Sequence, residues 1–383
     1  MKIYYWSPFF TNIATIKAVM RSAESLVKFS KKGEINISLI NSIGEWDRFK
    51  KIIHKKVNVI ELSKIKLLNY LPKGSFLKSR ISYMIIFFWS FFNLKNLINK
   101  DKPDYLIIHL MTSLPIFLSL FFNKKTKIIL RISGLPKINF IRFVFWKLFS
   151  NKINQITCPT KATYDYLIKK KIFKKNKLSV LSDPIISMKE FVLKKNEYLQ
   201  QEELKNVQFI LGIGRLTKQK NFELLVNFFI RISSVHKNIH LVIIGEGEQK
   251  QALNKIILDS NLSNRIHMLG YQNNVFKFLL RAKCFILSSL WEDPGFVLVE
   301  AALANTNIIS SNCPNGPKEI LKNNGFIFEN NNIDDLIIKF QEFSETSNDN
   351  IYQNKLELKK RIKIFTQYSH YKNLNEIITN KQQ

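Results

Sequence analysis

The 383-residue chain has few of the residues that would build a disulfide framework or a zinc site. Its three cysteines, Cys158, Cys284 and Cys313, stand far apart, and no Cys-x-x-Cys pair or histidine cluster lies at metal-ligand spacing. These spacings disfavour a disulfide scaffold and a structural metal, and they fit a reducing cytosol.

Acidic residues are scarce in one half of the chain. Residues 1–200 hold 37 Lys and Arg against 11 Asp and Glu, a balance of +26, whereas residues 201–383 hold 22 and 18, a balance of +4. Lysine outnumbers arginine 49 to 10, as in a protein from an AT-rich genome. Such a bias explains lysine in place of arginine, but not why the excess ends near residue 200. We therefore expect the first half to carry a basic face for an anionic partner.

The apolar runs of the first half are short. Residues 3–16 lack charge, but proline and asparagine interrupt them and no cleavage site for a signal peptide follows, so they predict a buried strand and loop. Three further apolar segments are shorter than the roughly 18–20 residues of a membrane span, and predict core helices or interfacial helices on a bilayer, with a transmembrane helix as the less favoured alternative. They are Ile81–Leu94, Ser113–Phe122 and Phe140–Phe149.

Strands and helices alternate through both halves, which predicts two α/β domains with parallel, doubly wound sheets. The expected bounds are 1–188 for the first domain, 189–206 for a polar linker, 207–350 for the second domain and 351–383 for a C-terminal helical segment. The strands expected in the first half are Ile3–Trp6, Ile35–Ile40, Val57–Leu62, Tyr105–His109, Lys127–Ile132 and Asn176–Leu181. Those expected in the second half are Val207–Gly212, His240–Ile244, Ile266–Leu269, Cys284–Ser288 and Asn307–Ser310.

A glycine-rich turn follows the first strand of the second half. Gly212-Ile213-Gly214-Arg215-Leu216 is followed by Lys218, Lys220 and Asn221. Glycines at a strand end let the backbone approach a ligand closely, and a helix N-terminus behind them favours negative charge. Arg215 and Lys220 add positive charge at the same place, which suits a diphosphate.

Two glutamates, Glu292 and Glu300, flank the expected start of a helix near Gly295. Glu292 precedes the helix and Glu300 lies in its second turn. Carboxylates accept paired hydrogen bonds from sugar hydroxyls, and the free N–H groups of a helix start reach phosphate. The alternative is structural, with Glu292 stabilising the helix dipole and Glu300 in solvent.

Together these blocks resemble the retaining GT-B glycosyltransferases of the large group 1 family, whose donor site has a G-x-G-R-L-x-x-x-K-N segment and an E-x7-E segment. Leu269-Gly270-Tyr271, the Ala282–Ser289 stretch and Glu319-Ile320 followed by Gly325 also match, in the family's order. The resemblance implies an α/β GT-B fold, in which two Rossmann-like doubly wound domains face each other across a cleft.

The resemblance also assigns roles to residues of the second half. Arg215 and Lys220, beside Gly214, would hold the donor diphosphate and neutralise the leaving group. Glu300 would bind the ribose and Glu292 a hydroxyl of the transferred sugar. The backbone of Leu269 and Gly270 would contact the base, and that of Gly295 and Phe296 the sugar or phosphate. The chain has no Asp-x-Asp triplet, so the resemblance implies metal-independent transfer without a cofactor beyond the nucleotide sugar.

The first half departs from the family. The loop Ser7–Thr15 lacks the Gly-Gly pair that members often carry. His109 occupies the place of a family histidine near the reacting sugar, although a buried structural histidine is an equal alternative. Arg131 stands at the start of Arg131–Gly134, where members often have His-Gly, and Ser133 and Gly134 are retained as cleft candidates.

The segment Cys313–Ile320 resembles a loop of bacterial polysaccharide and lipid-linked oligosaccharide transferases. The predicted function is therefore transfer of a hexose or N-acetylhexosamine, with retention, from a UDP-sugar to a lipid-linked or growing surface glycan such as an O-antigen. We expect a cytoplasmic protein that is peripheral on the inner face of the cell membrane and docks on its anionic surface. The alternatives are a nucleotide-sugar epimerase of the same fold and a membrane-binding or nucleic-acid-binding protein; no nucleic-acid-binding motif supports the last.

Overall fold

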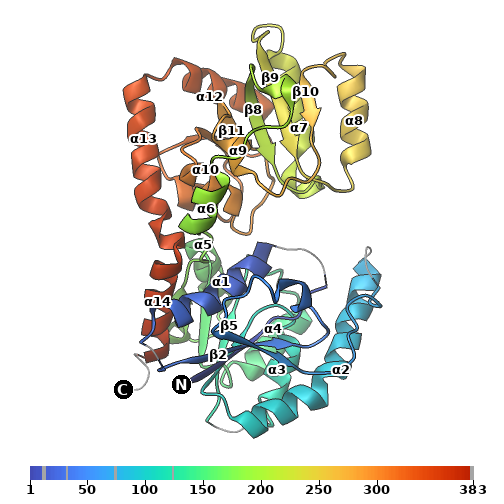
Figure 1. Ribbon diagram of the computed structural model, residues 1–383, viewed down its shortest axis with the longest axis vertical. Coiled ribbons are helices and arrows are strands. Elements are labelled where there is room, and N and C mark those ends of the chain that lie inside the picture. The colour runs from blue at the N-terminus through green and yellow to red at the C-terminus, as the bar shows by residue number, and fades with distance from the viewer. Residues whose placement is uncertain (11–13, 32, 73–75, 123–124, 380–383) are drawn as a thin grey trace. The chain divides into compact units, whose positions relative to one another are not determined.

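The computed structural model describes residues 1–10, 14–31, 33–72, 76–122 and 125–379. The chain forms two compact units, one of Met1–Ile185 with Thr366–Gln383 and the other of Ile186–Phe365 (Figure 1). Residues 11–13 of the glycine-free loop Ser7–Thr15 lie outside the described residues.

The first unit is built on a seven-stranded parallel sheet with the order β3-β2-β1-β4-β5-β6-β7. The strand order reverses between β1 and β4, which gives the doubly wound topology that the alternation predicts. Its strands are β1 Lys2–Trp6, β2 Asn36–Asn41, β3 Val57–Glu61, β4 Tyr105–Ile108, β5 Lys127–Arg131, β6 Gln155–Cys158 and β7 Leu178–Val180. Strand β6 was not among the sequence-based predictions, because Gln155 and Thr157 break the apolar pattern although all four of its residues are buried.

Alternate residues of this sheet face two cores. Tyr4 and Trp6 of β1 pack with one set of helices, whereas Ile3 and Tyr5 pack with the other. The first set is α2 Phe76–Asp101, α3 Ser113–Leu118, α4 Phe140–Phe149 and α5 Lys161–Lys170, and the second is α1 Ala14–Phe29 and α14 Gln367–Thr379. Both faces of the sheet are therefore covered, as parallel sheets require.

Helix α2 is much longer than the apolar segment Ile81–Leu94 that the sequence marks out. It runs for 26 residues. Leu77–Asp101 is long and apolar enough to cross a membrane by length and composition, with 28% of its most apolar stretch buried inside the protein. The expectation that this segment is too short for a span was therefore wrong on length, because the helix extends through polar residues on both sides.

The second unit has a six-stranded parallel sheet with the order β10-β9-β8-β11-β12-β13. Its strands are β8 Gln208–Ile213, β9 Ile239–Ile244, β10 Ile266–Met268, β11 Cys284–Leu287, β12 Ile308–Ser311 and β13 Phe326–Phe328. The first five match the predicted strands to within two residues at each end. Strand β13 was not among the sequence-based predictions.

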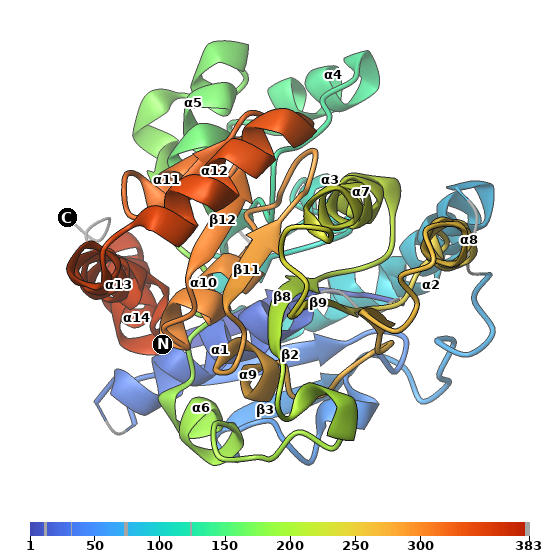
Figure 2. The ribbon, with the colours of Figure 1, turned by 90° about the horizontal axis from the view of Figure 1, so that it is seen from above.

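Helices cover both faces of the second sheet as well. Helix α7 lies on one side of β8 and β11, and α9 lies on the other (Figure 2). Phe228 and Phe229 of α7 and Phe340 of α12 are fully buried in the core of the first side. The helices are α6 Met188–Lys194, α7 Phe222–Ile232, α8 Lys250–Asp259, α9 Phe276–Leu279, α10 Phe296–Leu303, α11 Pro317–Leu321, α12 Ile333–Glu345 and α13 Asn348–Arg361.

The segment expected as a linker, 189–206, contains most of α6 and packs on the second unit. The Phe191 ring meets the Phe276 ring edge to face at 5.1 Å, and Asn274 donates a hydrogen bond to the carbonyl oxygen of Lys194 at 2.8 Å. The chain instead crosses between units at Ile185–Ile186 and again at Phe365–Thr366.

The C-terminal segment expected at 351–383 is divided between the units. Helix α13 stays with the second unit, where Arg361 donates to the carbonyl oxygens of Glu319 and Ile320. Helix α14 returns to the first unit and buries Leu374 and Ile378 against α1. The apolar face of α14 needs a partner, and α1 of the first unit supplies it.

Candidate functional site

Five strand ends form one polar edge of the second sheet. Strands β8 to β12 are parallel, so their carboxyl ends meet at the same edge, which is where doubly wound sheets bind ligands. Backbone hydrogen bonds join the loops there: Gly214 donates to the Ile244 carbonyl oxygen and Gly245 to that of Gly270, both at 2.9 Å. The structure thus brings together the predicted residues Gly214, Leu269 and Gly270.

Gly245 and Gly247, which the sequence-based site did not include, allow this close packing. A Cβ atom on Gly245 would lie 1.7 Å from the Gly214 carbonyl oxygen, and one on Gly247 would lie 2.3 Å from that of Leu216. Gly245 also has φ of +147°, a conformation that L residues rarely adopt. The Gly-x-Gly spacing after β9 was the signal that could have identified them.

Lys220 and Glu292 form the centre of the site. The Lys220 ammonium lies 2.6 Å from Oε1 of Glu292, and the two side chains are only 15% and 4% exposed. The Ser289 hydroxyl donates to the same carboxylate oxygen at 2.5 Å. A buried carboxylate needs such partners, so Glu292 is held in one orientation by a cation and a hydroxyl.

The loops around this pair hold it in place. The Ser288 hydroxyl donates to the Lys220 carbonyl oxygen at 2.9 Å, and Asn315 donates to the Glu292 carbonyl oxygen at 3.1 Å. A Cβ atom on Gly316 would lie 1.9 Å from the Pro294 carbonyl oxygen, so the Cys313–Ile320 loop packs directly on the loop that follows Glu292. Ser288, Ser289 and Asn315 are supporting residues that sequence reasoning missed, since nothing in their spacing points to Glu292.

Arg215 and Glu300 lie at the rim of the site. The Arg215 side chain is exposed and its guanidinium approaches Oε1 of Gln219 at 3.4 Å. Gly295, with φ of +86°, precedes α10, whose first residue is Phe296. Glu300 is half-buried in the second turn of this helix, as the sequence predicted. Charged groups of both signs and the free N–H groups of a helix start are thus presented at one edge.

His109 belongs to the first unit and follows β4, beside the switch point of that sheet. Its ring stacks on Tyr5 with centroids 6.1 Å apart and is 2% exposed, and its Nδ1 has no hydrogen-bond partner among the described residues. Burial, and then the charge of Arg131, hold its pKa well below 6.5, so the imidazole is neutral. Arg131 forms a buried ion pair with Asp183, and Ser133 and Gly134 beyond it are half-buried.

Comparison with known protein families finds a match in the second unit. Residues 194–363 match the family model of glycosyl transferases, group 1. The match lies within the second unit and covers most of it. For the second unit, this match confirms the family resemblance that the G-x-G-R-L and E-x7-E segments predicted.

Solved structures resemble both units of the chain. The chain aligns over 100% of its length with 98% of a glycosyltransferase from Rickettsia africae, at 16% identity and a TM-score of 0.75. It also aligns over 99% of its length with all of Anabaena HepE in complex with UDP-glucose, at 14% identity and a TM-score of 0.72. At these identities the likeness concerns the fold, and it confirms the predicted GT-B architecture of two Rossmann-like domains.

Curated relatives match over shorter stretches. One is the N-acetylgalactosamine-N,N'-diacetylbacillosaminyl-diphospho-undecaprenol 4-alpha-N-acetylgalactosaminyltransferase of Campylobacter jejuni, 25% identical over 238 residues, which are 59% of this chain and 60% of the relative. The chain spans between 27% and 60% of the length of the first relatives it matches.

Proposed function

We propose that this protein transfers a hexosyl or N-acetylhexosaminyl group from a UDP-sugar to a lipid-linked or growing surface glycan. The observation that carries the proposal is the Lys220–Glu292 pair, buried at the strand ends beside the exposed Arg215. A diphosphate needs cations, a sugar needs a fixed hydrogen-bond acceptor, and this edge offers both within one loop cluster.

In the proposed reaction, the bond between the anomeric carbon and the β-phosphate oxygen breaks, and the acceptor hydroxyl oxygen bonds to that carbon and loses its proton. Negative charge grows on the departing UDP. Lys220 and Arg215 would neutralise it, which lowers the barrier because these cations are already in position. Glu292 would hold a hydroxyl of the transferred sugar and Glu300 the ribose hydroxyls.

The proposal also covers the stereochemistry of transfer, the need for a metal ion, the backbone contacts of the donor and the role of His109. We propose retention of configuration and transfer without a metal ion. The backbone of Leu269 and Gly270 would contact the base, and that of Gly295 and Phe296 the sugar or phosphate. His109, neutral and next to the switch point of the first sheet, would contact the transferred sugar by a hydrogen bond rather than donate charge.

The acceptor class and donor nucleotide of the proposed enzyme rest on relatives. The matched Campylobacter protein is named for a diphospho-undecaprenol acceptor, and HepE was solved with UDP-glucose. We propose a similar acceptor class and donor nucleotide here, with the enzyme in the cytoplasm at the inner face of the cell membrane. No nucleic-acid partner is proposed.

Titration calorimetry with UDP and a UDP-release assay test this proposal. The purified protein should bind UDP, and Arg215→Ala should weaken binding about tenfold or more, the effect of losing one charge-assisted contact of about 1.5–3 kcal/mol. Arg231→Ala is the matched control, because Arg231 is an exposed arginine of the same unit that pairs with Asp334. Equal UDP affinity in all three proteins would contradict the donor site, and conversion of the UDP-sugar to its epimer without acceptor would favour the epimerase.

A further inference from the structure

Helix α2 has two apolar faces, and only one of them is covered by the protein. Leu94 and Ile98 are fully buried in the core cluster of the first sheet, and Ile86 is fully buried in a smaller cluster with Ile43 and Leu71. The hydroxyl side chains of Ser82 and Ser90 are buried on the same side. The apolar residues on the opposite side are exposed. They are Leu77 (72%), Ile81 (50%), Met84 (61%), Ile85 (38%), Phe88 (68%) and Phe92 (70%).

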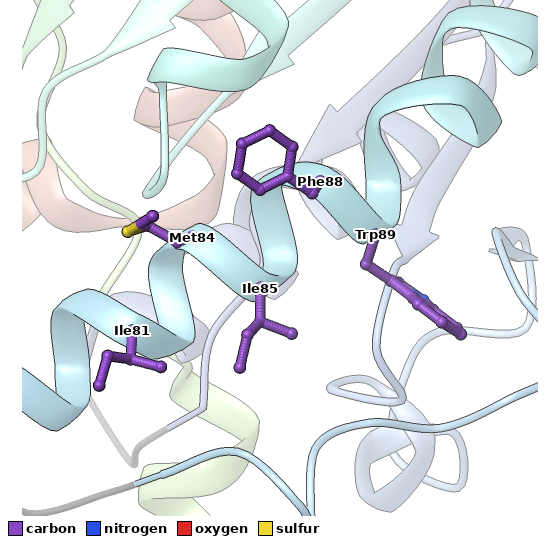
Figure 3. A pocket seen from close by; sticks show the side chains of 5 residues that line it. All are labelled: Ile81, Met84, Ile85, Phe88 and Trp89. Carbon is purple, nitrogen blue, oxygen red and sulfur yellow. The ribbon is translucent and has the colours of Figure 1, made fainter.

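These six residues form one continuous stripe. Their spacing is i, i+4, i+7, i+8, i+11 and i+15, which places them within about 100° of arc on a helix with 3.6 residues per turn. Fifteen residues rise about 22 Å, so the stripe runs for about that length. Near its middle, Ile81, Met84, Ile85, Phe88 and Trp89 line a shallow hollow of about 480 Å³ (Figure 3).

Helix α4 adds a second apolar stripe. Phe140 (81%), Ile141 (77%), Val144 (36%) and Leu148 (72%) are exposed at i, i+1, i+4 and i+8, again on one side of a helix. Trp146 on the other side is buried in the unit's core. Single exposed apolar side chains are ordinary, but two helices with unpartnered apolar stripes in one unit are not.

The two helices lie close to each other. Phe117 of α3 packs between them, 6.4 Å from Phe87, 6.2 Å from Phe91 and 6.3 Å from Phe149, measured between ring centroids. Burial, followed by the charge of Arg80 on α2, lowers the pKa of Arg142 on α4, so the first turns of both helices are within electrostatic reach. The two exposed stripes are called the α2–α4 face below.

The sequence segments that contain α2 and α4 are rich in basic residues and poor in acidic ones. Residues 62–100 contain seven Lys and Arg and no Asp or Glu, and residues 105–164 contain nine and none. Helix α4 carries Arg142 and Lys147 without an acidic residue. An apolar surface for a soluble protein partner does not need such an excess of basic over acidic residues in the segments that form it, whereas an anionic lipid headgroup layer attracts basic residues, each by about 1 kcal/mol.

We propose that the α2–α4 face inserts into the headgroup and outer acyl region of an anionic bilayer, with α2 lying in the plane of the membrane. Helix α2 is long enough to span, but its buried face closes the core of the first unit. Crossing the bilayer would remove Ile86, Leu94 and Ile98 from that core, and in-plane insertion removes nothing. The proposal does not rest on sugar transfer, because it is measured without donor or acceptor.

Vesicle co-sedimentation of the full chain tests the partner. Wild-type protein should bind phosphatidylcholine vesicles that contain about 30% phosphatidylglycerol, should bind pure phosphatidylcholine vesicles at least about tenfold more weakly, and should dissociate in part at about 1 M salt. Phe88→Ser combined with Phe92→Ser, Phe140→Ser and Ile141→Ser should lower the partition coefficient at least about tenfold.

The matched control is Val235→Ser with Leu258→Ser, two apolar side chains of the second unit that are 78% and 65% exposed. It should bind vesicles as wild type does. Far-UV circular dichroism checks that both variants remain folded. Wild-type binding by the fourfold variant, or equal loss in the control, would overturn the proposal. Binding only to vesicles that contain polyprenyl phosphate would overturn it too, and would assign the face to a lipid tail instead.

Depth measurements test the orientation. Cys158, Cys284 and Cys313 are buried, so a fluorophore will label an introduced cysteine selectively. Labels at Ile81→Cys, Phe88→Cys and Phe92→Cys should be quenched to the same extent by lipids brominated at one acyl position, since the stripe is parallel to the surface. A steady change in depth from residue 81 to residue 92 would indicate a span. A stable dimer in light scattering without vesicles, dispersed by Phe88→Ser, would assign the face to a second copy.

Discussion

Removal of the Lys220 ammonium tests the proposed donor site. It should lower both the free energy of unfolding and the affinity for UDP, and these two effects can be measured separately. The Glu292 carboxylate is 4% exposed and loses the cation 2.6 Å away, while the Ser289 hydroxyl remains. Breaking a buried pair by removing one partner costs about 3–5 kcal/mol. Lys220 is 15% exposed, so we expect Lys220→Ala to lower the free energy of unfolding by about 3 kcal/mol, near the lower limit of that range.

A second substitution separates the effect of Lys220→Ala on stability from its effect on UDP binding. In Lys220→Ala/Glu292→Gln, the residue left at position 292 is a neutral amide of nearly the same shape, and the uncompensated charge is gone. The double variant should therefore be more stable than Lys220→Ala by about 1–2 kcal/mol. UDP affinity should stay at least about tenfold below wild type in both, because the cation for the phosphate is missing in both.

Calorimetric unfolding measures the change in stability, and UDP titration measures the change in affinity. A loss of about 3 kcal/mol corresponds to about 6–12 °C in the melting temperature of a unit of this size. Lys339→Ala is the control, since Lys339 and Glu342 form a pair at 2.8 Å that is 27% and 49% exposed, and its loss should change stability by less than about 0.5 kcal/mol. The reasoning is refuted if the double variant is no more stable than Lys220→Ala, or if it binds UDP as wild type does.

Four further outcomes are expected. Glu300→Gln should lower UDP affinity in titration calorimetry, whereas Glu292→Gln should mainly lower the rate of sugar transfer while UDP still binds; wild-type values for both would exclude the paired roles. Transfer should continue in EDTA, and a loss that Mg²⁺ or Mn²⁺ restores would show metal dependence. Gly245→Ala should destabilise the second unit by about 2 kcal/mol or more in urea unfolding, because its Cβ would meet the Gly214 carbonyl oxygen at 1.7 Å. Burial holds the pKa of His370 at about 3 in the folded chain, against an ordinary value of 6.5. The folded state therefore binds fewer protons between these values, and stability should fall as pH drops from 6.5, by up to about 1.4 kcal/mol per pH unit. Urea unfolding at pH 7 and pH 5 should show a weaker pH dependence in His370→Gln than in wild type.

The donor half of the protein could be predicted from sequence in some detail. The strands of the second sheet are short apolar runs, and its glycines and charged residues stand directly after them. Since parallel strands end at one edge, residues that follow β8, β10 and β11 had to come together, and Gly214, Gly270 and Glu292 do. The order of the strands was not needed for this conclusion.

The contacts between these loops could not be predicted in the same way. Lys220 and Glu292 are 72 positions apart, and their ion pair depends on β8 lying next to β11 in the sheet. Ser289 and Asn315 support Glu292 from loops that sequence spacing does not connect to it. Such contacts are set by strand order and loop packing, and a linear pattern contains neither.

By itself, the sequence determined that the chain has two parallel α/β units, which half carries the donor motifs, and which half carries the excess of positive charge. Only the tertiary structure decided that α14 completes the first unit and that one side of α2 is covered while the other is exposed. The physical reason is the same for both. Helix α2 is apolar on both sides, so its sequence has no periodicity that distinguishes a buried face from an exposed one, and α14 is separated from its partner α1 by more than 330 residues. Burial is a property of the neighbours a residue acquires in the fold.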